Sequence, residues 1–229
     1  MRALGILKYE CKDTDAVLSR LPKKEEERLR GKAREYVLSS AMGRLLLFSL
    51  CDRLLGKNSY EKRVAYREHP AGKGVGAPYL VNMEHLSVSI SHTEGGCAVF
   101  LCDEGECGVD MESITSLKAI NEKRQRVIEK RFHLSDFQEK IEADNDNLTT
   151  IVYIYNEKLG VLEQKEEKQP TKISSEGFEF LAQYTRMEAV GKTFGLGVSF
   201  LSKREEYLSR VRVKTQAFDD FVVSFAYEK

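Results

Sequence analysis

The chain has 229 residues, 41% of them hydrophobic and 31% charged, which is the balance of a soluble globular protein long enough to bury its own core. Its 36 Lys and Arg equal its 36 Asp and Glu, so neither a basic field for nucleic acid nor an acidic solvating tail is indicated. The start lacks the long apolar segment of a signal peptide, and the most apolar stretch, residues 37–50, is short and contains Arg44, so we expect a cytoplasmic protein without a membrane segment.

The first third of the chain is predicted to contain one strand and one long helix. Residues 2–9 are strand-like. From Pro22 to Leu55, apolar residues recur at three- and four-residue steps, which predicts a single amphipathic helix that begins with a charged turn. The glycine-rich stretch 71–78 is expected to be a loop, and it lacks the spacing of a phosphate-binding P-loop.

Three strands are predicted next. Residues 85–92 (HLSVSISH) alternate between polar and apolar side chains, whereas residues 97–102 are apolar on both faces and should be buried. Residues 107–113 (CGVDMES) form the third strand. The five cysteines are odd in number and match no zinc spacing, so we expect them to be small buried apolar residues in strands.

The rest of the chain alternates helices and hairpins. The highly charged residues 116–142 predict one or two surface helices, and the β-branched and aromatic residues at 148–168 predict a hairpin around a Lys-Leu-Gly turn. A helix capped by Ser then runs to Lys192, and a second hairpin closes the chain. Because this last hairpin resembles the strand pair at 85–102, we expect an α+β fold of two similar halves.

Asp110 and Glu112 are one residue apart on a predicted strand, so both carboxylates project to the same side. A solvated strand end would also give this pattern. Magnesium, however, is commonly bound by one or two carboxylates together with water and substrate phosphate. A cation between the two like charges is therefore one interpretation of the pair.

Tyr184, Glu188 and Lys192 are spaced four residues apart and share one face of the predicted helix. An ordinary Glu to Lys helix pair is the simplest explanation. Gly191 and the glycines just after it are a poor choice for helix stability, so a close backbone approach or a bound ligand is the alternative. His92, at the end of an alternating strand, either caps a turn or donates to a phosphate.

Three segments together resemble the motifs of the phosphopantetheinyl transferase superfamily in its Sfp-type, two-half form. Members carry a Ser-His turn, a Gly-(Val/Ile)-Asp-x-Glu strand and a helix with Trp-x-x-Lys-Glu-x-x-x-Lys. The order of the motifs fits, and the resemblance covers most of the chain apart from about residues 143–170. The matching residues are Ser91-His92, Gly108-Val109-Asp110-Met111-Glu112 and Tyr184-Thr185-Arg186-Met187-Glu188-Ala189-Val190-Gly191-Lys192.

The resemblance implies a pseudo-two-fold fold with halves at residues 1–103 and 104–229, each a small, mostly antiparallel sheet packed with a long helix. It also implies a Mg²⁺-dependent enzyme that transfers the 4′-phosphopantetheine arm of coenzyme A to a serine of an apo acyl or peptidyl carrier protein and releases 3′,5′-ADP. We expect a monomer whose halves form one site at their junction.

The same resemblance gives roles to individual residues. Asp110, Glu112 and Glu188 would hold Mg²⁺, and Glu188 would also take the proton of the incoming serine, directly or through a metal-bound water. Lys192 would neutralise charge on the diphosphate as it breaks. The side chains that would contact coenzyme A are Lys24, Arg28, Lys73, Ser91 and His92.

Several positions depart from the family pattern. The Lys expected before the metal-binding Glu is Met187, the Lys of a Gly-Lys-Pro turn is Ala77, and the Trp is Tyr184. Lys73 and Arg186 could replace the lost cations, each worth on the order of 1–3 kcal/mol of charge-assisted binding. The alternative is a non-catalytic member of the fold that binds coenzyme A or a carrier protein without transferring the arm.

Two further departures concern the helices and the connection between them. An arginine often present in the long helix corresponds roughly to Ser39 or Ser40. The segment around 143–170 lengthens the connection between Glu112 and Glu188, and it is interpreted as a surface insertion in the C-terminal half, either decoration or part of a carrier contact. A generic metal-dependent phosphohydrolase would need more converging carboxylates and histidines than the sequence offers.

Overall fold

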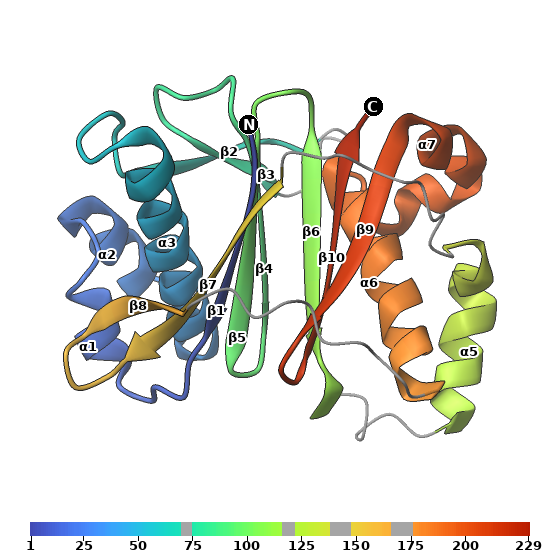
Figure 1. The fold of residues 1–229 in the computed structure, drawn as a ribbon, viewed down its shortest axis with the longest axis horizontal. Coiled ribbons are helices and arrows are strands. Elements are labelled where there is room, and N and C mark those ends of the chain that lie inside the picture. Colours follow the sequence, from blue (N-terminus) through green and yellow to red (C-terminus); the bar gives the residue numbers. More distant parts are fainter. Residues whose placement is uncertain (70–74, 116–121, 138–147, 166–175) are drawn as a thin grey trace.

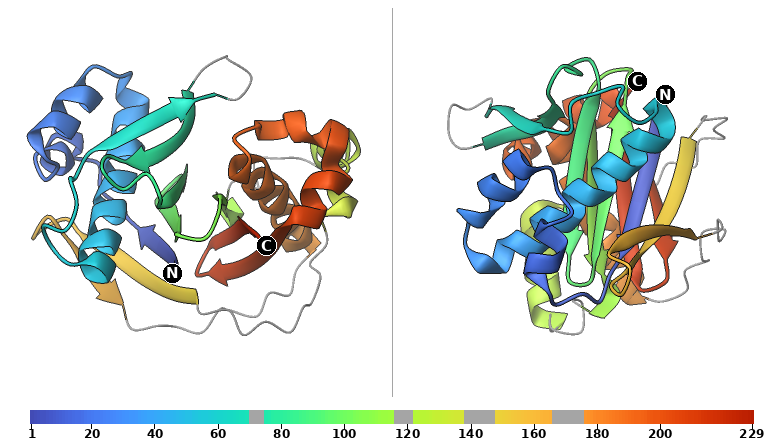
Figure 2. Two further views of the ribbon diagram at one scale, coloured as in Figure 1. Left: turned by 90° about the horizontal axis from the view of Figure 1, so that it is seen from above. Right: turned by 90° about the vertical axis from the view of Figure 1, so that its left-hand side faces the viewer.

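Two β-sheets face each other in the middle of the protein, and helices cover the outer face of each sheet (Figure 1). A computed structural model describes residues 1–69, 75–115, 122–137, 148–165 and 176–229. The helix α3 (Arg34–Leu55) packs on a five-stranded sheet, and α6 (Glu176–Thr193) packs on a three-stranded sheet. Seen from above, the two groups of helices lie on opposite sides of the strands (Figure 2). The protein therefore has a mixed α+β fold, as the sequence predicts.

The remaining elements are given in chain order. Up to residue 103 these are β1 (Arg2–Lys8), α1 (Thr14–Leu18), α2 (Lys23–Arg30), β2 (Val64–Glu68), β3 (Val75–Leu80), β4 (Ser87–Thr93) and β5 (Gly96–Cys102). After it come β6 (Cys107–Ser113), α5 (Glu122–Phe132), the 3-10 helix η1 (Leu134–Asp136), β7 (Leu148–Asn156), β8 (Val161–Lys165), the 3-10 helix η2 (Gly197–Lys203), α7 (Arg204–Arg210), β9 (Val211–Phe218) and β10 (Phe221–Glu228).

The strand order is β4-β5-β1-β7-β8 in the large sheet and β6-β10-β9 in the smaller one. All pairs are antiparallel except β1 with β7. Alternation along β5 directs Phe100 between the sheets and Leu101 toward α3, so both faces of this strand are buried. The prediction that residues 97–102 are buried on both faces is confirmed.

The two sheets meet where β4 lies beside β6. The polar positions of β4 alternate with apolar ones, so its serines all point to β6 while Val88 points to α3. Each serine hydroxyl accepts a backbone N–H that the β6–β10 ladder does not use. These bonds, 2.9–3.2 Å long, join Cys107 to Ser87, Val109 to Ser89 and Met111 to Ser91.

The predicted single helix from Pro22 to Leu55 is wrong, because the structure has two helices, α2 and α3. Gly31 follows the last residue of α2, and Ala33 has an extended backbone (ψ 133°) before α3 begins. Leu29 and Val37 are buried in the same core, so the apolar periodicity continues across the break and conceals it. The short helix α1 was not predicted.

The glycine-rich stretch 71–78 was expected to be a loop, but β3 begins at Val75 and pairs with β2. Residues 70–74 lie outside the described residues. A β-carbon on Gly76 would lie 2.7 Å from the carbonyl oxygens of Arg67 and Glu68, next to an irregularity in the register. Glycine therefore allows a close passage of two strands here, where the sequence predicted a loop.

The hairpin at 148–168 is confirmed as β7 and β8, although residues 166–168 lie outside the described part. Its assignment as an insertion in the C-terminal half is wrong, because β7 pairs with β1 in the sheet of the N-terminal half. Ile151, Tyr153 and Tyr155 alternate along β7 and are buried in the core under α3. The hairpin is therefore part of the packed sheet rather than surface decoration.

The other predicted elements agree with the described part of the chain. The strands at 2–9, 85–92 and 107–113 and the closing hairpin are present, and residues 122–136 form α5 and η1. All five cysteines are free and buried, although Cys11 and Cys51 lie outside strands. Across the described ranges, no helix combines the length and apolar character needed to cross a bilayer.

Candidate functional site

Gly108 sets how closely α6 approaches β6. A β-carbon at this position would overlap the carbonyl oxygen of Ala189 and lie 2.6 Å from the backbone nitrogen of Thr193. Gly108, Asp110 and Glu112 alternate along β6, so all three face the helix. The same close packing brings Glu188 and Lys192, on neighbouring turns of α6, to the two strand carboxylates.

Lys192 and Asp110 form the centre of the cluster. The Lys192 ammonium donates to Oδ1 of Asp110 at 2.7 Å and to Oγ of Ser91 at 3.1 Å, and the Ser91 hydroxyl donates to Asp110 Oδ1 at 2.9 Å. Ser91 is buried, and through Met111 N–H it also belongs to the sheet junction. The second oxygen of Asp110, Oδ2, is buried without a hydrogen-bond partner among the described residues.

Glu112 accepts a hydrogen bond from Thr93 Oγ1 at 3.2 Å. Burial and the nearby Asp110 charge raise the pKa of Glu112 to about 7, while Thr93 and Lys192 act in the opposite direction. Thr93 was not singled out from the sequence. Its position two residues after Ser91 was the available signal, because residues at this spacing on a strand share a face.

Glu188 lies close enough to the strand carboxylates to interact with them. Burial and the Asp110 charge raise the pKa of Glu188, and Lys192 and a hydrogen bond from Tyr184 partly offset this shift. Burial and the Glu188 charge in turn raise the pKa of Tyr184 to about 12, so its hydroxyl stays protonated and can donate. The Tyr184 ring stacks on Phe180, with centroids 6.3 Å apart.

In the described ranges, no three side chains of His, Cys, Asp or Glu are arranged as a ready metal site. Asp110 instead has an ammonium as its partner. Two observations nevertheless fit a divalent cation. The buried Asp110 Oδ2 has no partner among the described residues, and burial, followed by the charge of Asp110, raises the pKa of Glu112 and Glu188. Oxygen donors of this kind suit Mg²⁺ better than a softer metal.

His92 comes directly after Ser91 on β4 and therefore points to the opposite face of the strand, toward Gly43 of α3. Desolvation, and next the charges of Lys192 and Arg44, lower the pKa of His92. The imidazole is thus held neutral and can donate one N–H. The positive charges near this histidine were not predicted from the sequence.

A cavity of about 850 Å³ adjoins the cluster. It lies between the end of β1, the start of α3 and the β4–β5 turn, and His92 and Thr93 form part of its wall. Since Thr93 also holds Glu112, the cavity and the carboxylate cluster share a wall. Other residues that line it are Tyr9, Glu10, Cys11, Lys12, Tyr36, Leu38, Ser39, Glu94 and Gly95.

The other predicted coenzyme A contacts lie elsewhere. Lys24 is exposed and 3.9 Å from Glu61, and Arg28 donates to the carbonyl of Val64 at 2.6 Å. Lys73 is among the residues that the structure does not describe. A buried pair, Glu25 with Arg44 at 2.6 Å, connects the helix carrying Lys24 and Arg28 to α3.

The positions that depart from the family pattern have structural explanations. Met187 is fully buried in the core under α6, so a lysine in its place would need a different environment. Arg186 donates to Thr215 Oγ1 at 2.7 Å and to the Phe137 carbonyl at 3.1 Å, so the idea that it replaces a lost phosphate cation is wrong. A β-carbon on Gly191 would overlap the carbonyl oxygen of Gly197, which confirms the predicted close backbone approach.

Compared with protein-family models and with curated proteins, the chain matches none. The resemblance therefore depends on the residues and their arrangement alone. Ser91, Asp110, Glu112, Glu188 and Lys192, predicted from three separate segments, come together at the contact of β4, β6 and α6.

Proposed function

We propose that the chain is a phosphopantetheinyl transferase that moves the 4′-phosphopantetheine arm of coenzyme A to a serine of a carrier protein. The observation that supports this most is the convergence of Asp110, Glu112, Glu188 and Lys192, which lie up to 82 positions apart in the sequence, at the contact of β6 and α6. Three carboxylates and one mobile cation are what a magnesium diphosphate needs.

The arrangement of the layers is in keeping with the two-half form of that fold. A long helix, α3 or α6, backs each of the two main sheets, and the site lies where the sheets meet. We infer a pseudo-two-fold relation between the halves, with β7 and β8 as an addition to the first. The cavity beside His92 and Thr93 is the proposed place for part of coenzyme A.

In the proposed reaction, the carrier serine oxygen bonds to the phosphorus that carries pantetheine. The bond from that phosphorus to 3′,5′-ADP breaks, and the serine proton passes to Glu188. Without a bound cation, burial and then the Asp110 charge raise the pKa of Glu188. Tyr184 holds that carboxylate through a hydrogen bond.

Mg²⁺, held by Asp110, Glu112 and Glu188, would supply positive charge to the diphosphate. Lys192, whose ammonium pairs with Asp110 at 2.7 Å, would neutralise the departing phosphate. Ser91 and Thr93 keep Asp110 and Glu112 in place throughout, because each hydroxyl donates to one carboxylate. His92 donates its N–H to a phosphate oxygen of coenzyme A.

A second candidate is a non-catalytic binding module with the same fold. The observations that favour it are the buried Met187 and the ion pair that occupies Asp110. Such a module would bind coenzyme A or a carrier protein without any need for the metal. Its affinity would then be the same with and without Mg²⁺.

An assay of phosphopantetheine transfer tests the proposed activity directly. The purified protein is incubated with coenzyme A, Mg²⁺ and a panel of apo acyl and peptidyl carrier proteins, and the mass of each carrier is measured. We expect a phosphopantetheine adduct on at least one carrier and none with Glu188→Gln. Folded protein that modifies no carrier, but binds one of them, would support the non-catalytic module instead.

A further inference from the structure

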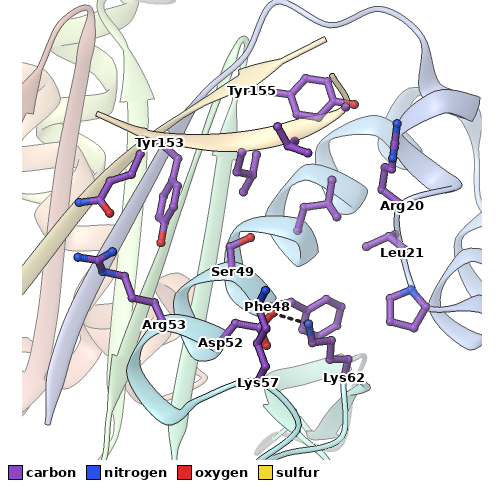
Figure 3. A pocket seen from close by; sticks show the side chains of 16 residues that line it. Arg20, Leu21, Phe48, Ser49, Asp52, Arg53, Lys57, Lys62, Tyr153 and Tyr155 are labelled. Atoms are coloured by element: carbon purple, nitrogen blue, oxygen red, sulfur yellow. Dashed lines mark hydrogen bonds and ion pairs between the residues drawn. The ribbon is translucent and has the colours of Figure 1, made fainter. Parts of the chain in front are cut away.

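A second cavity, of about 800 Å³, lies between α3 and the β7–β8 hairpin (Figure 3). Its volume is in the range of small-molecule sites. No residue of the carboxylate cluster lines it in the described part of the chain. The cavity is therefore separate from the proposed transfer site.

The cavity has an apolar wall that the hairpin completes. Leu45 and Phe48 of α3 form one side, while Leu162 and the aromatic rings of Tyr153 and Tyr155 form the other. Without β7 and β8 this side of α3 would have no cover, so the hairpin creates the cavity. This gives a physical role to the segment that departs from the family pattern.

Positive charge gathers around this apolar wall. Arg53 and Lys57, near the end of α3, are exposed and make no hydrogen bond or ion pair with the described residues. Lys62 differs, because Asp52 neutralises it at 2.5 Å. In Figure 3, Arg53, Lys57 and Lys62 lie on one side of the cavity. Two cations there are thus available to a ligand.

Arg20 closes the opposite side of the cavity. It lies near Tyr155 in Figure 3 and donates to the carbonyl of Leu159 in the hairpin turn at 3.4 Å. Gly160 makes room for it, because any side chain at this left-handed position (φ +64°) would collide with the guanidinium. The Arg20 guanidinium is thus engaged with the hairpin turn, whereas Arg53 and Lys57 on the other side have no hydrogen-bond or ion-pair partner among the described residues.

We propose that this cavity binds a small organic anion with an apolar body. Its carboxylate or phosphate pairs with Arg53 and Lys57, and its body lies against Phe48, Leu45 and Leu162. Opposite charge at one end and apolar contact along the rest are the two features that orient a ligand in a pocket of this size.

The test uses isothermal titration calorimetry on the full chain with decanoate and decyl phosphate below their micelle concentrations and with decanol below its solubility limit. We expect both anions to bind, and the neutral alcohol to bind at least about tenfold more weakly because it lacks a charged group. A preference between decanoate and decyl phosphate identifies the head group as carboxylate or phosphate.

Variants separate this site from nonspecific binding. The double variant Arg53→Gln, Lys57→Gln should weaken anion binding about tenfold or more, and Val161→Asp, at an exposed residue of the cavity wall, should weaken it by repulsion. Lys158→Gln lowers the net charge by the same amount as Val161→Asp, on the same hairpin but outside the cavity, and should change nothing. Absence of anion binding, equal binding of decanol, or an equal loss in Lys158→Gln would each overturn the proposal.

Discussion

Lys192 on α6 donates to Asp110 on β6 at 2.7 Å, although the two residues are 82 positions apart in the sequence. The lysine side chain is 31% exposed, whereas that of Asp110 is 8% exposed. The ammonium is therefore the more accessible of the two charged groups. In the ligand-free protein this ion pair attaches the helix to the strand.

Lys192→Met should lower the free energy of unfolding, because it leaves the Asp110 carboxylate buried without its cation. We expect a loss of about 1–2 kcal/mol, between the values for exposed and fully buried pairs. Urea unfolding measures the change. Lys203→Met, at an exposed position, is the control and should have no effect. An unchanged stability of Lys192→Met would show that the ion pair contributes nothing.

Gly108→Ala should destabilise the protein, because its methyl group would overlap the Ala189 carbonyl and push α6 away from β6. Overpacking of this kind costs about 1–3 kcal/mol. The matched control is Gly31→Ala, where the nearest atom is 3.9 Å away and φ is −79°. Thermal unfolding compares the two. Equal melting temperatures would mean that the helix tolerates a wider separation.

Glu112 makes stability depend on pH in the metal-free protein. Its pKa is raised from 4.5 to about 7 in the folded state, so the folded protein binds the proton more tightly than the unfolded chain. This contribution is fully present below pH 4.5 and is lost as the pH rises to about 7. Glu112→Gln should therefore be more stable than the original protein at pH 8.

Denaturant unfolding at pH 4.5 and pH 8 tests this dependence, with Glu179→Gln on the exposed face of α6 as the control. The gain of Glu112→Gln over the original protein should be larger at pH 8 than at pH 4.5. Added Mg²⁺ should stabilise the original protein at pH 8 and have less effect on Glu112→Gln. A gain that is independent of pH would contradict the role given to burial and to Asp110.

Ser89→Ala removes the hydroxyl that accepts the Val109 N–H at 2.9 Å, at the junction of the two sheets. A buried N–H without an acceptor costs about 1–3 kcal/mol. We expect a loss of stability in this range. The control is Ser209→Ala on the exposed helix α7, where the hydroxyl donates to a backbone carbonyl at 2.7 Å. Removing this hydroxyl leaves no buried polar group without a hydrogen-bond partner. Equal behaviour of the two variants in denaturant would exclude a structural role for the junction.

The elements with a clear period were predictable from the sequence. Residues 97–102 are apolar throughout and become an interior strand of the large sheet, and the helix predicted to run to Lys192 is present as α6. The break at Gly31 was missed because Leu29 and Val37 enter the same core. The sequence also could not predict which strand pairs with β7. Its partner is β1, and the paired residues are about 146 positions apart, such as Arg2 with Leu148.

The candidate site was predictable where residue type and spacing carried the information. The carboxylates on one side of β6, and the helix face with Glu188 and Lys192, required only the periods of a strand and a helix. The partners of these residues were not predictable. That Lys192 would pair with Asp110, and that Thr93 would hold Glu112, depends on how α6 and β4 pack against β6.

Coenzyme A binding measured by calorimetry, with and without Mg²⁺, tests the joint role of the strand and helix carboxylates most directly. We expect the original protein and Glu179→Gln to bind coenzyme A far more tightly with Mg²⁺, and Asp110→Asn and Glu188→Gln to lose this dependence. If the affinity is the same with and without Mg²⁺, or if Glu188→Gln binds as the original protein does, the carboxylate cluster does not hold a magnesium diphosphate.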